Sequence, residues 1–345
     1  MEHPSPLEDP RLAGYLLEPL TGGWSGETFL ATLDGRSGTA AGNQVVVRYF
    51  ADARHAEHAA RIQAALLARV CGLLPVPVVH QAHDGDATLP GLLITELVPG
   101  ERGDLVLARL TAGGAEPRRQ ADALRTAGRA LGRIAGALAA VPMPRTGMFA
   151  DATLRIEPFD LWLPDWVDTH APRLAESGWS DGEIGALRAV AERAARELDG
   201  APACLVHSDL NPKNVLLDPV TLEVTGVLDW EFAHAGHPAT DLGNLLRFDR
   251  EPAYVEGVLD GYLAAAGTAG GARGEGGDPG EPARRRATEL ARAADLVALV
   301  DLAARPARPA TNPVVRRARE HLRAIARTGD VHAAPGPAAL ACGHA

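Results

Sequence analysis

One stretch near the middle of the chain, residues 205–217, constrains the fold more than any other. It reads Leu-Val-His-Ser-Asp-Leu-Asn-Pro-Lys-Asn-Val-Leu-Leu, so a polar segment lies between two short apolar runs. Short apolar runs separated by Asp, Asn and Pro are typical of two strands joined by a loop. A further apolar run, residues 224–228, ends at Asp229. The pattern predicts a loop carrying Asp209 and Asn214 beside a strand that ends in an acid.

The side chains of this loop suit phosphoryl transfer. Asp209 can accept the proton of an attacking hydroxyl or orient that hydroxyl. Asn214 offers a neutral oxygen and Asp229 a carboxylate, and Mg²⁺ prefers such oxygen ligands. The same residue types also occur in ordinary surface turns. The combination with Asp229, Asp241 and an upstream sheet favours the catalytic interpretation.

Three residues close to the loop have roles that the sequence leaves open. His207 can take part in the reaction or brace the loop by packing and hydrogen bonds, and bracing is favoured. Asp241 opens an expected helix, where a carboxylate can cap the helix or tie down the catalytic loop. Lys213, the only lysine in the chain, can steady a transferring phosphoryl group or point into solvent.

Length, charge and cysteine content limit the class of protein. A chain of 345 residues with 46% hydrophobic residues is long enough for two lobes with a sizeable core. A net charge of −10 argues against non-specific nucleic-acid binding. The three cysteines are dispersed, the first residues lack a signal-peptide pattern, and no run of about 18 apolar residues occurs. We therefore expect a cytoplasmic protein with neither a nucleic-acid nor a membrane partner, either a monomer or a homodimer.

Hydrophobic periodicity changes near Gly100, from strand-like to helical. Before this point we expect a small antiparallel sheet with one helix, and after it a mainly helical region. We expect residues 1–13 to be a loose arm, 267–282 a Gly-rich mobile insertion and 328–345 a disordered tail. The expected strands cover residues 15–20, 27–33, 44–50 and 91–98, with an extended piece at 75–79. The expected helices cover residues 55–70, 121–140, 159–173, 180–198, 241–248, 252–265, 281–304 and 314–327.

The motif His207-Ser-Asp-Leu-Asn-Pro-Lys-Asn214, followed by Val227-Leu-Asp-Trp-Glu231 and Asp241-Leu, resembles the aminoglycoside phosphotransferase family. This family is also called the phosphotransferase enzyme family, and the resemblance covers about residues 14–305. It implies an α+β, bilobal, protein-kinase-like fold, with a small antiparallel-sheet N-lobe (14–98) and a mainly helical C-lobe (99–327). It also implies Mg²⁺-dependent transfer of the γ-phosphoryl group of ATP, or of GTP, to a hydroxyl of a small molecule.

The resemblance assigns nucleotide-binding residues in the N-lobe. Arg48 stands where the family usually has a lysine that contacts the α- and β-phosphates, and arginine is a permanent, forked cation well suited to phosphate. Glu57 is its expected partner, or else a solvated acid on the helix face. A glycine-containing loop whose backbone N–H groups cradle phosphate corresponds to Gly22, Gly23, Ser25 and Gly26. The purine would bind backbone groups near Thr95 and Leu97, ahead of a possible pivot at Pro99-Gly100.

The C-lobe is expected to bind the phosphate acceptor. Acids and indoles there suit a cationic acceptor through charge and cation–π contact, although they also suit a helix packed through its tryptophans with its acids in solvent. An aminoglycoside-type antibiotic and a metabolite such as a sugar, choline or homoserine are both compatible acceptors. A nucleotide-binding regulator without turnover is the alternative function, and the arginine at position 48 favours it. The candidate acceptor-binding residues are Glu231, Asp160, Trp162 and Asp165, with Glu157, Asp168, Trp166 and Trp230 on the same expected surface.

Overall fold

The chain divides into two compact units, each built from several stretches of sequence. In the computed structural model the described residues are 9–20, 28–33, 44–50, 58–86, 88–112, 114, 116–249, 251–269, 280–306 and 312–335. The sheet unit comprises Met1–Glu116, Gly147–Pro158 and Asn211–His234, and the helical unit comprises Pro117–Thr146, Phe159–Leu210 and Ala235–Ala345. The sequence analysis placed one boundary at residue 98, between two contiguous lobes. The two units are not contiguous in sequence, because residues 211–234 pack with the N-terminal sheet elements.

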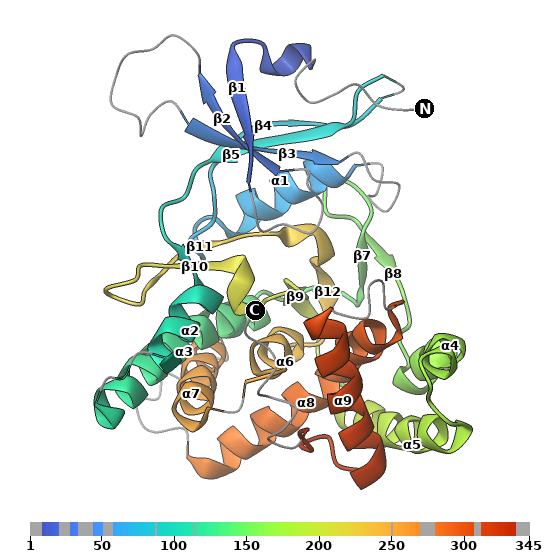
Figure 1. Cartoon of the computed structure of the whole chain (residues 1–345). Helices are drawn as coiled ribbons and strands as arrows, with labels where there is room; N and C mark the ends of the chain where they lie inside the picture. Colours follow the sequence, from blue (N-terminus) through green and yellow to red (C-terminus); the bar gives the residue numbers. More distant parts are fainter. Residues whose placement is uncertain are drawn as a thin grey trace. The chain divides into compact units, whose positions relative to one another are not determined.

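A five-stranded antiparallel sheet forms the first part of the sheet unit (Figure 1). Its strand order is β1-β2-β3-β5-β4, and helix α1 (Ala59–Val70) packs against β4 and β5. The predicted strands are present with ends shifted by at most two residues, and β4 begins at Val79, the last residue of the predicted extended piece. The bounds are β1 Tyr15–Pro19, β2 Thr28–Leu33, β3 Gln44–Phe50, β4 Val79–His83 and β5 Gly91–Glu96.

Successive side chains of strand β3 lie on opposite faces of the sheet. Val47 and Tyr49 are buried and pack with Leu92 and Ile94 of the neighbouring part of the sheet. Because successive side chains of a strand point to opposite faces, Arg48 lies on the face away from this core. The burial of its two neighbours therefore fixes the direction in which Arg48 points.

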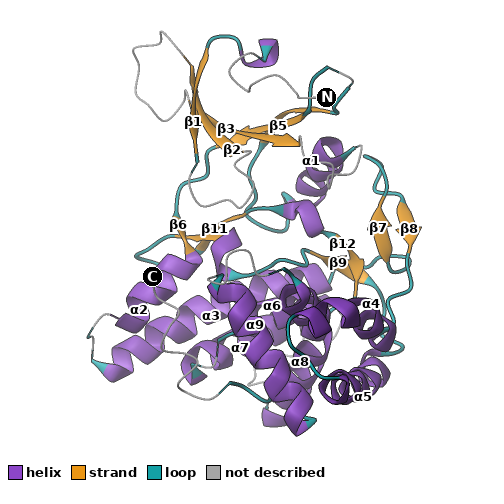
Figure 2. Ribbon diagram, turned by 45° about the vertical axis from the view of Figure 1, so that its right-hand side comes forward, coloured by secondary structure: helices purple, strands orange, loops and turns teal. Residues whose placement is uncertain are grey.

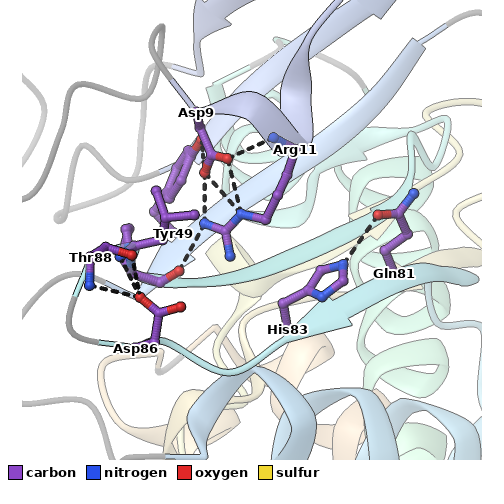
Figure 3. A network of polar contacts seen from close by, with 9 residues as sticks. Asp9, Arg11, Tyr49, Gln81, His83, Asp86 and Thr88 are labelled. Atoms are coloured by element: carbon purple, nitrogen blue, oxygen red, sulfur yellow. Dashed lines mark hydrogen bonds and ion pairs between the residues drawn. The ribbon is translucent and has the colours of Figure 1, made fainter.

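The segment that precedes β1 is anchored to the sheet. A 3₁₀ turn, η2 (Pro10–Leu12), is capped by Asp9, which accepts from the Arg11 backbone N–H at 2.9 Å. The Arg11 guanidinium donates to both Asp9 oxygens and to the Pro90 carbonyl, and the Tyr49 hydroxyl donates to Asp9 Oδ2 at 3.2 Å (Figure 3). Leu12 is buried in the core of the sheet. Residues 9–13 thus differ from the loose arm expected from sequence, because one capping carboxylate and one apolar side chain hold them in place.

Smaller elements complete the sheet unit. A three-stranded sheet has the order β11-β10-β6, and helix α2 (Gly103–Ala112) follows β6 directly. Strands β7 and β8 form an antiparallel hairpin. Two 3₁₀ turns, η4 (Pro212–Asn214) and η5 (Trp230–Phe232), flank the β10–β11 pair. The strand bounds are β6 Glu101–Arg102, β7 Gly147–Phe149, β8 Ile156–Pro158, β10 Val215–Leu217 and β11 Val224–Val227.

The helical unit packs α4, α5, α8 and α9 around one apolar core (Figure 2). The predicted capping box is confirmed, since Ser180 Oγ accepts from the Glu183 N–H and the Glu183 carboxylate accepts from the Ser180 N–H. None of the described helices has the length and apolarity that a membrane-spanning segment requires. The helix bounds are α3 Pro117–Ala139, α4 Leu163–Glu176, α5 Asp181–Leu198, α6 Thr240–Leu246, α7 Pro252–Ala269, α8 Glu281–Ala304 and α9 Pro313–Thr328.

Two segments expected to be irregular are partly helical. Helix α7 continues to Ala269 and α8 begins at Glu281, so only residues 270–279 of the expected Gly-rich insertion lie outside the described residues. Helix α9 ends at Thr328, where Gly329 adopts a left-handed conformation and its N–H donates to the Ile325 carbonyl. Residues 336–345 of the expected tail lie outside the described part.

Helices α3 and α7 approach each other backbone to backbone. A Cβ atom at Gly132 of α3 would overlap the Val258 carbonyl group, and one at Gly261 of α7 would overlap the Arg129 carbonyl group. Gly128, Gly136 and Gly257 are in equally close contact with the facing helix. Glycine is required at these positions because a side chain of any size would force the two helices apart.

We expect Gly132→Ala to lower the free energy of unfolding by about 1–3 kcal/mol, the usual cost of overpacking. Alanine has a higher helix propensity than glycine, which by itself would raise the free energy of unfolding by up to about 1 kcal/mol. The overpacking cost has to exceed this gain for the variant to be less stable than wild type. Gly185→Ala is the matched control, since an added Cβ there has open space in the exposed face of α5. Denaturant unfolding should show the control unchanged or stabilised, and a stabilised Gly132→Ala would refute this close contact.

We expect Asp9→Asn to destabilise the protein at neutral pH but not in acid. Burial opposes the charge of Asp9, yet hydrogen bonds from Arg11 outweigh burial and lower the pKa of this carboxyl. A group with a lowered folded pKa stabilises above its unfolded pKa, and the stabilisation is lost as pH falls through the folded pKa. The stability difference between wild type and variant in denaturant unfolding should therefore shrink below about pH 4. A difference that does not change with pH would contradict this assignment.

Candidate active site

Asn214 and Asp229 lie together at one end of the β10–β11 pair. The strands are in antiparallel register with Val215 opposite Val227, and the Leu228 N–H donates to the Asn214 carbonyl at 2.8 Å. Asn214 immediately precedes β10. Asp229 immediately follows Leu228, the residue that bonds to Asn214. The register therefore brings together an amide and a carboxylate that are 15 residues apart in sequence.

The turn after β11 fixes the direction of the Asp229 side chain. Asp229 adopts the left-handed conformation, with φ 65° and ψ 63°, and begins the 3₁₀ turn η5. Aspartate tolerates this conformation better than most residues, at a cost of about 1 kcal/mol. The Trp230 side chain is buried, and its indole N–H donates to the Val227 carbonyl at 3.0 Å. Trp230 thus anchors the turn and is not part of an exposed acceptor-binding surface.

The pair fits a magnesium ion by its chemistry. Asn214 is buried and Asp229 is partly exposed, so one neutral and one anionic oxygen donor are presented from the same strand end. Mg²⁺ commonly takes only one or two protein ligands and completes its shell with phosphate oxygens and water. The donor types of Asn214 and Asp229 match this preference.

Arg48 pairs with two acids that follow strand β11. Its Nη1 atom lies 2.6 Å from Asp229 Oδ1, and its Nη2 atom donates to Glu231 Oε2. The guanidinium also lies 5.4 Å from the centre of the Phe50 ring. Arg48 and Glu231 are mostly shielded from solvent, whereas the Asp229 side chain is 35% exposed. Shielding strengthens the attraction between two charges but also raises the cost of removing them from water. Glu231, which the sequence placed among acceptor-binding residues, pairs with Arg48, and its contact with an acceptor stays a prediction.

The remaining predicted nucleotide-site residues are described only in part. Thr95 is buried in β5 and pairs with Val46 and Val79, while Leu97 follows the last residue of β5 and is exposed. Glu57 and the glycine-loop residues Gly22, Gly23, Ser25 and Gly26 lie outside the described residues.

The predicted pivot at Gly100 is tightly packed. Gly100 has a φ of 140°, and a Cβ atom there would overlap the Thr225 side chain. Glycine therefore lets the chain after β5 pass close to β11 and enter β6.

The loop that carries Asp209 belongs to the helical unit and follows strand β9 (Cys204–Val206). Asp241, on α6, is almost fully buried and accepts hydrogen bonds from the backbone N–H groups of His207 and Ser208, both at 2.8 Å. Ser208 adopts a left-handed conformation with φ 66°. The prediction that Asp241 ties down the loop is confirmed by these two hydrogen bonds.

His207 braces the loop from within. Its side chain is fully buried, and its Nδ1 atom accepts a hydrogen bond from the Asp209 backbone N–H at 3.3 Å. This contact needs an unprotonated Nδ1 atom. The favoured interpretation of His207 as a brace is thus supported by its contacts.

Lys213 sits in the 3₁₀ turn between Asp209 and β10. The Asn211 side chain accepts from the Lys213 backbone N–H at 3.2 Å and caps the turn. The Lys213 residue is half-buried. The backbone of Lys213 is therefore held in place, one residue before Asn214 and four residues after Asp209.

The predicted acceptor-binding cluster divides into structural and exposed members. Trp166 donates from its indole N–H to the Val297 carbonyl at 3.0 Å, and Asp168 pairs with Arg188. Asp160, Trp162 and Asp165 are exposed around the start of α4, where Trp162 is 46% exposed. Glu157 and Asp168 are also exposed, and each forms an ion pair with a nearby arginine.

Similarity to solved structures defines the fold class. A candidate aminoglycoside phosphotransferase from Ralstonia eutropha has a TM-score of 0.58 and 16% identity, with 91% of each chain covered. A thermostable variant of the aminoglycoside phosphotransferase APH(4)-Ia, in complex with ADP and hygromycin B, has a TM-score of 0.56 and 17% identity, with 92% of this chain and 94% of that chain covered. These likenesses confirm the predicted α+β, protein-kinase-like fold.

The family follows from the sequence match. The model of the phosphotransferase enzyme family matches residues 16–277, and the chain belongs to this family. Among curated proteins, a 45-residue stretch is 47% identical to acyl-CoA dehydrogenase family member 11 of Mus musculus and 44% identical to that of Rattus norvegicus. The match covers 13% of this chain and 6% of each relative.

We expect Arg48 and Glu231 to show a favourable coupling of about 1–2 kcal/mol in a double-mutant cycle, because the two charges are in contact and mostly shielded from water. The variants are Arg48→Met, Glu231→Gln and the double variant, compared by denaturant unfolding. The pair Arg155 and Glu157, separated by 3.7 Å and more exposed, is the matched control. Equal coupling in both cycles would contradict a special role for the Arg48 pair.

Proposed function

We propose that this protein is a small-molecule kinase, which transfers the γ-phosphoryl group of ATP, or of GTP, to a hydroxyl of its acceptor. The observation that carries the proposal is the anchored Asp209 loop, whose flanking N–H groups bond to the buried Asp241. Asn214 and Asp229 follow in the same motif and meet at one strand end. Membership of the phosphotransferase enzyme family supports this reaction class.

Asp209 is proposed to orient the acceptor hydroxyl and accept its proton. Asn214 and Asp229 would hold Mg²⁺, which when bound neutralises charge on the phosphates. Lys213, whose backbone is fixed in the same motif, would stabilise negative charge on the phosphoryl group as it is transferred. The main chains of Asp209, Lys213 and Asn214 are each held by a hydrogen bond to a neighbouring residue.

Arg48 is proposed to bind the nucleotide phosphates. A guanidinium has five N–H donors, so Arg48 can keep a carboxylate partner while it donates to a phosphate oxygen. Its contact with Asp229 links the phosphate-binding cation to the proposed metal ligand. Glu57, the glycine loop at Gly22, Gly23, Ser25 and Gly26, and the backbone near Thr95 and Leu97 complete the proposed nucleotide site.

The acceptor is proposed to be a cationic hydroxyl compound. The exposed group at the start of α4 combines two acids with an indole, which suits a cation through charge and cation–π contact. An aminoglycoside-type antibiotic fits this description, and so does a metabolite such as choline. A cytoplasmic location agrees with the free thiols of Cys71 and Cys204.

A second candidate function is a nucleotide-binding regulator that lacks turnover. The observation that favours it is the pairing of Arg48 with Asp229, because this contact engages the proposed metal ligand. The two functions differ in one measurement, the formation of phosphorylated product from a panel of hydroxyl compounds. Binding of Mg²⁺-ATP without product from any acceptor would support the regulator.

We expect Asp209→Asn to lower the transfer rate by about 10²–10⁴-fold, because the variant keeps the side-chain size but removes the base. Nucleotide affinity should change little, since Asp209 is not proposed to hold the nucleotide or the metal. Asp218→Asn is the matched control, because an Asn preserves the turn that Asp218 forms with the Val220 and Thr221 N–H groups. Mass spectrometry of acceptor panels and calorimetry with ATP measure the two effects. Full activity of Asp209→Asn would exclude the proposed role.

A further inference from the structure

We propose that Asn244, Arg247 and Asp295 form a buried brace that positions the catalytic loop, and that Asn244 is a positioning residue for phosphoryl transfer. The inference rests on the kinase reaction proposed above. It assigns a role in this reaction to helix α8, which carries Asp295 and no residue of the proposed catalytic set. The sequence pointed to none of the three residues, because nothing in the residues around each one marks it as a partner of the loop.

The brace begins at the residue after the catalytic aspartate. The Leu210 backbone N–H donates to Asn244 Oδ1 at 3.1 Å, and Leu210 is fully buried. A buried backbone N–H without a partner costs about 1–3 kcal/mol, so this contact fixes the main chain on the C-terminal side of Asp209. Asp241 fixes the N-terminal side through Ser208. Two side chains one turn apart on α6 therefore hold the backbone on both sides of Asp209.

The orientation of the Asn244 amide is set by α8. Asn244 Nδ2 lies 3.5 Å from Asp295 Oδ1, which leaves Oδ1 of the amide directed to Leu210. The close approach of the helices allows this contact, because Gly243 of α6 has no Cβ to meet the Ala291 carbonyl of α8. Helices α6 and α8 lie side by side in the helical unit (Figures 1 and 2).

Asp295 is itself held by a buried cation. Arg247 Nε donates to Asp295 Oδ1 at 3.0 Å, and Arg247 Nη2 lies 2.9 Å from the same oxygen. Burial opposes the charge of Arg247, but the Asp295 carboxylate outweighs burial and raises the pKa of Arg247, with a smaller favourable contribution from Asp209. Apolar residues of similar volume would often give equal or greater stability than a buried ion pair. The ion pair instead fixes the orientation of the Asp295 carboxylate, and this carboxylate in turn orients the Asn244 amide.

Such a brace matters because the loop is strained and its function is sensitive to position. Ser208 pays about 1 kcal/mol for its left-handed conformation, so the loop would relax if its N–H contacts were weakened. A displacement of about 1 Å in a reacting group can lower a rate by about 10²-fold. Loss of the Asn244 contact should therefore reduce the chemical step more than the binding of nucleotide.

The test compares Asn244→Leu with a matched control. Leucine keeps the volume but removes the acceptor for Leu210, and we expect kcat to fall by about 10–100-fold. The KM for nucleotide should stay near the wild-type value, because Arg48, Asn214 and Asp229 belong to the sheet unit. Tyr254→Phe is the control, since it removes another buried hydrogen bond to α6, at the Leu245 carbonyl. The control should keep the wild-type kcat.

Amide hydrogen exchange provides a readout that does not depend on catalysis. In Asn244→Leu, the Leu210 amide should exchange faster than in wild type and in Tyr254→Phe. Asp295→Asn, which weakens the carboxylate that orients Asn244, should produce a smaller increase at the same amide. If Asn244→Leu does not fold, Asn244→Ala removes the same acceptor without adding a branched apolar side chain.

The outcomes separate this inference from the proposed function. If the wild-type protein phosphorylates no acceptor, the proposed function fails, while faster Leu210 exchange would still establish the brace. If the wild type is active and Asn244→Leu matches Tyr254→Phe in kcat, the positioning role is overturned. Unchanged Leu210 exchange in Asn244→Leu and Asn244→Ala would overturn the brace itself.

Discussion

The buried carboxylate of Asp241 is the contact on which the proposed catalytic loop depends. It accepts from the His207 and Ser208 N–H groups, and it holds Ser208 in a conformation that a free chain would avoid. A carboxylate that is almost fully buried needs such donors, because water cannot replace them. The position of the loop and the burial of the acid are therefore mutually dependent, and His207 adds a third support from inside the loop.

The sheet unit holds its charged groups in a different way. There a cation, Arg48, joins two acids that follow β11, and the alternation of β3 directs this cation away from the apolar core. In the helical unit, hydrogen bonds from backbone N–H groups to buried side chains fix the loop. In the sheet unit, ion pairs between side chains hold the acids. Charge pairs can exchange partners with phosphate and metal ions, and backbone amides held by a buried acid cannot do so easily. The more adaptable contacts thus lie where we propose that the nucleotide binds.

Local sequence patterns predicted most helices and strands. They could not predict contacts between residues that are far apart in sequence. The capping box at Ser180, the strands from 44 and 91 and the helix from 281 to 304 follow from spacing within a few residues. The pairing of Arg48 with Glu231 joins residues 183 positions apart, and residue type alone suggested substrate contact for Glu231. Asn244 was missed for the same reason, since nothing near it in sequence marks Leu210 as its partner. The turn at Asp9 could have been predicted, because Asp followed by Pro begins helical turns.

The single lysine has a practical consequence for chemical modification. Lys213 lies in the capped turn between Asp209 and Asn214, and its ammonium is the one lysine side chain that an amine-directed reagent can meet in this sequence. All other basic side chains besides histidine are arginine, which such reagents leave intact. Acylation of side-chain amines would therefore place one label inside the proposed catalytic motif, and peptide mapping would separate it from any label on an α-amine. If bound nucleotide slows the labelling of Lys213, the nucleotide site can be located without any substitution in the chain.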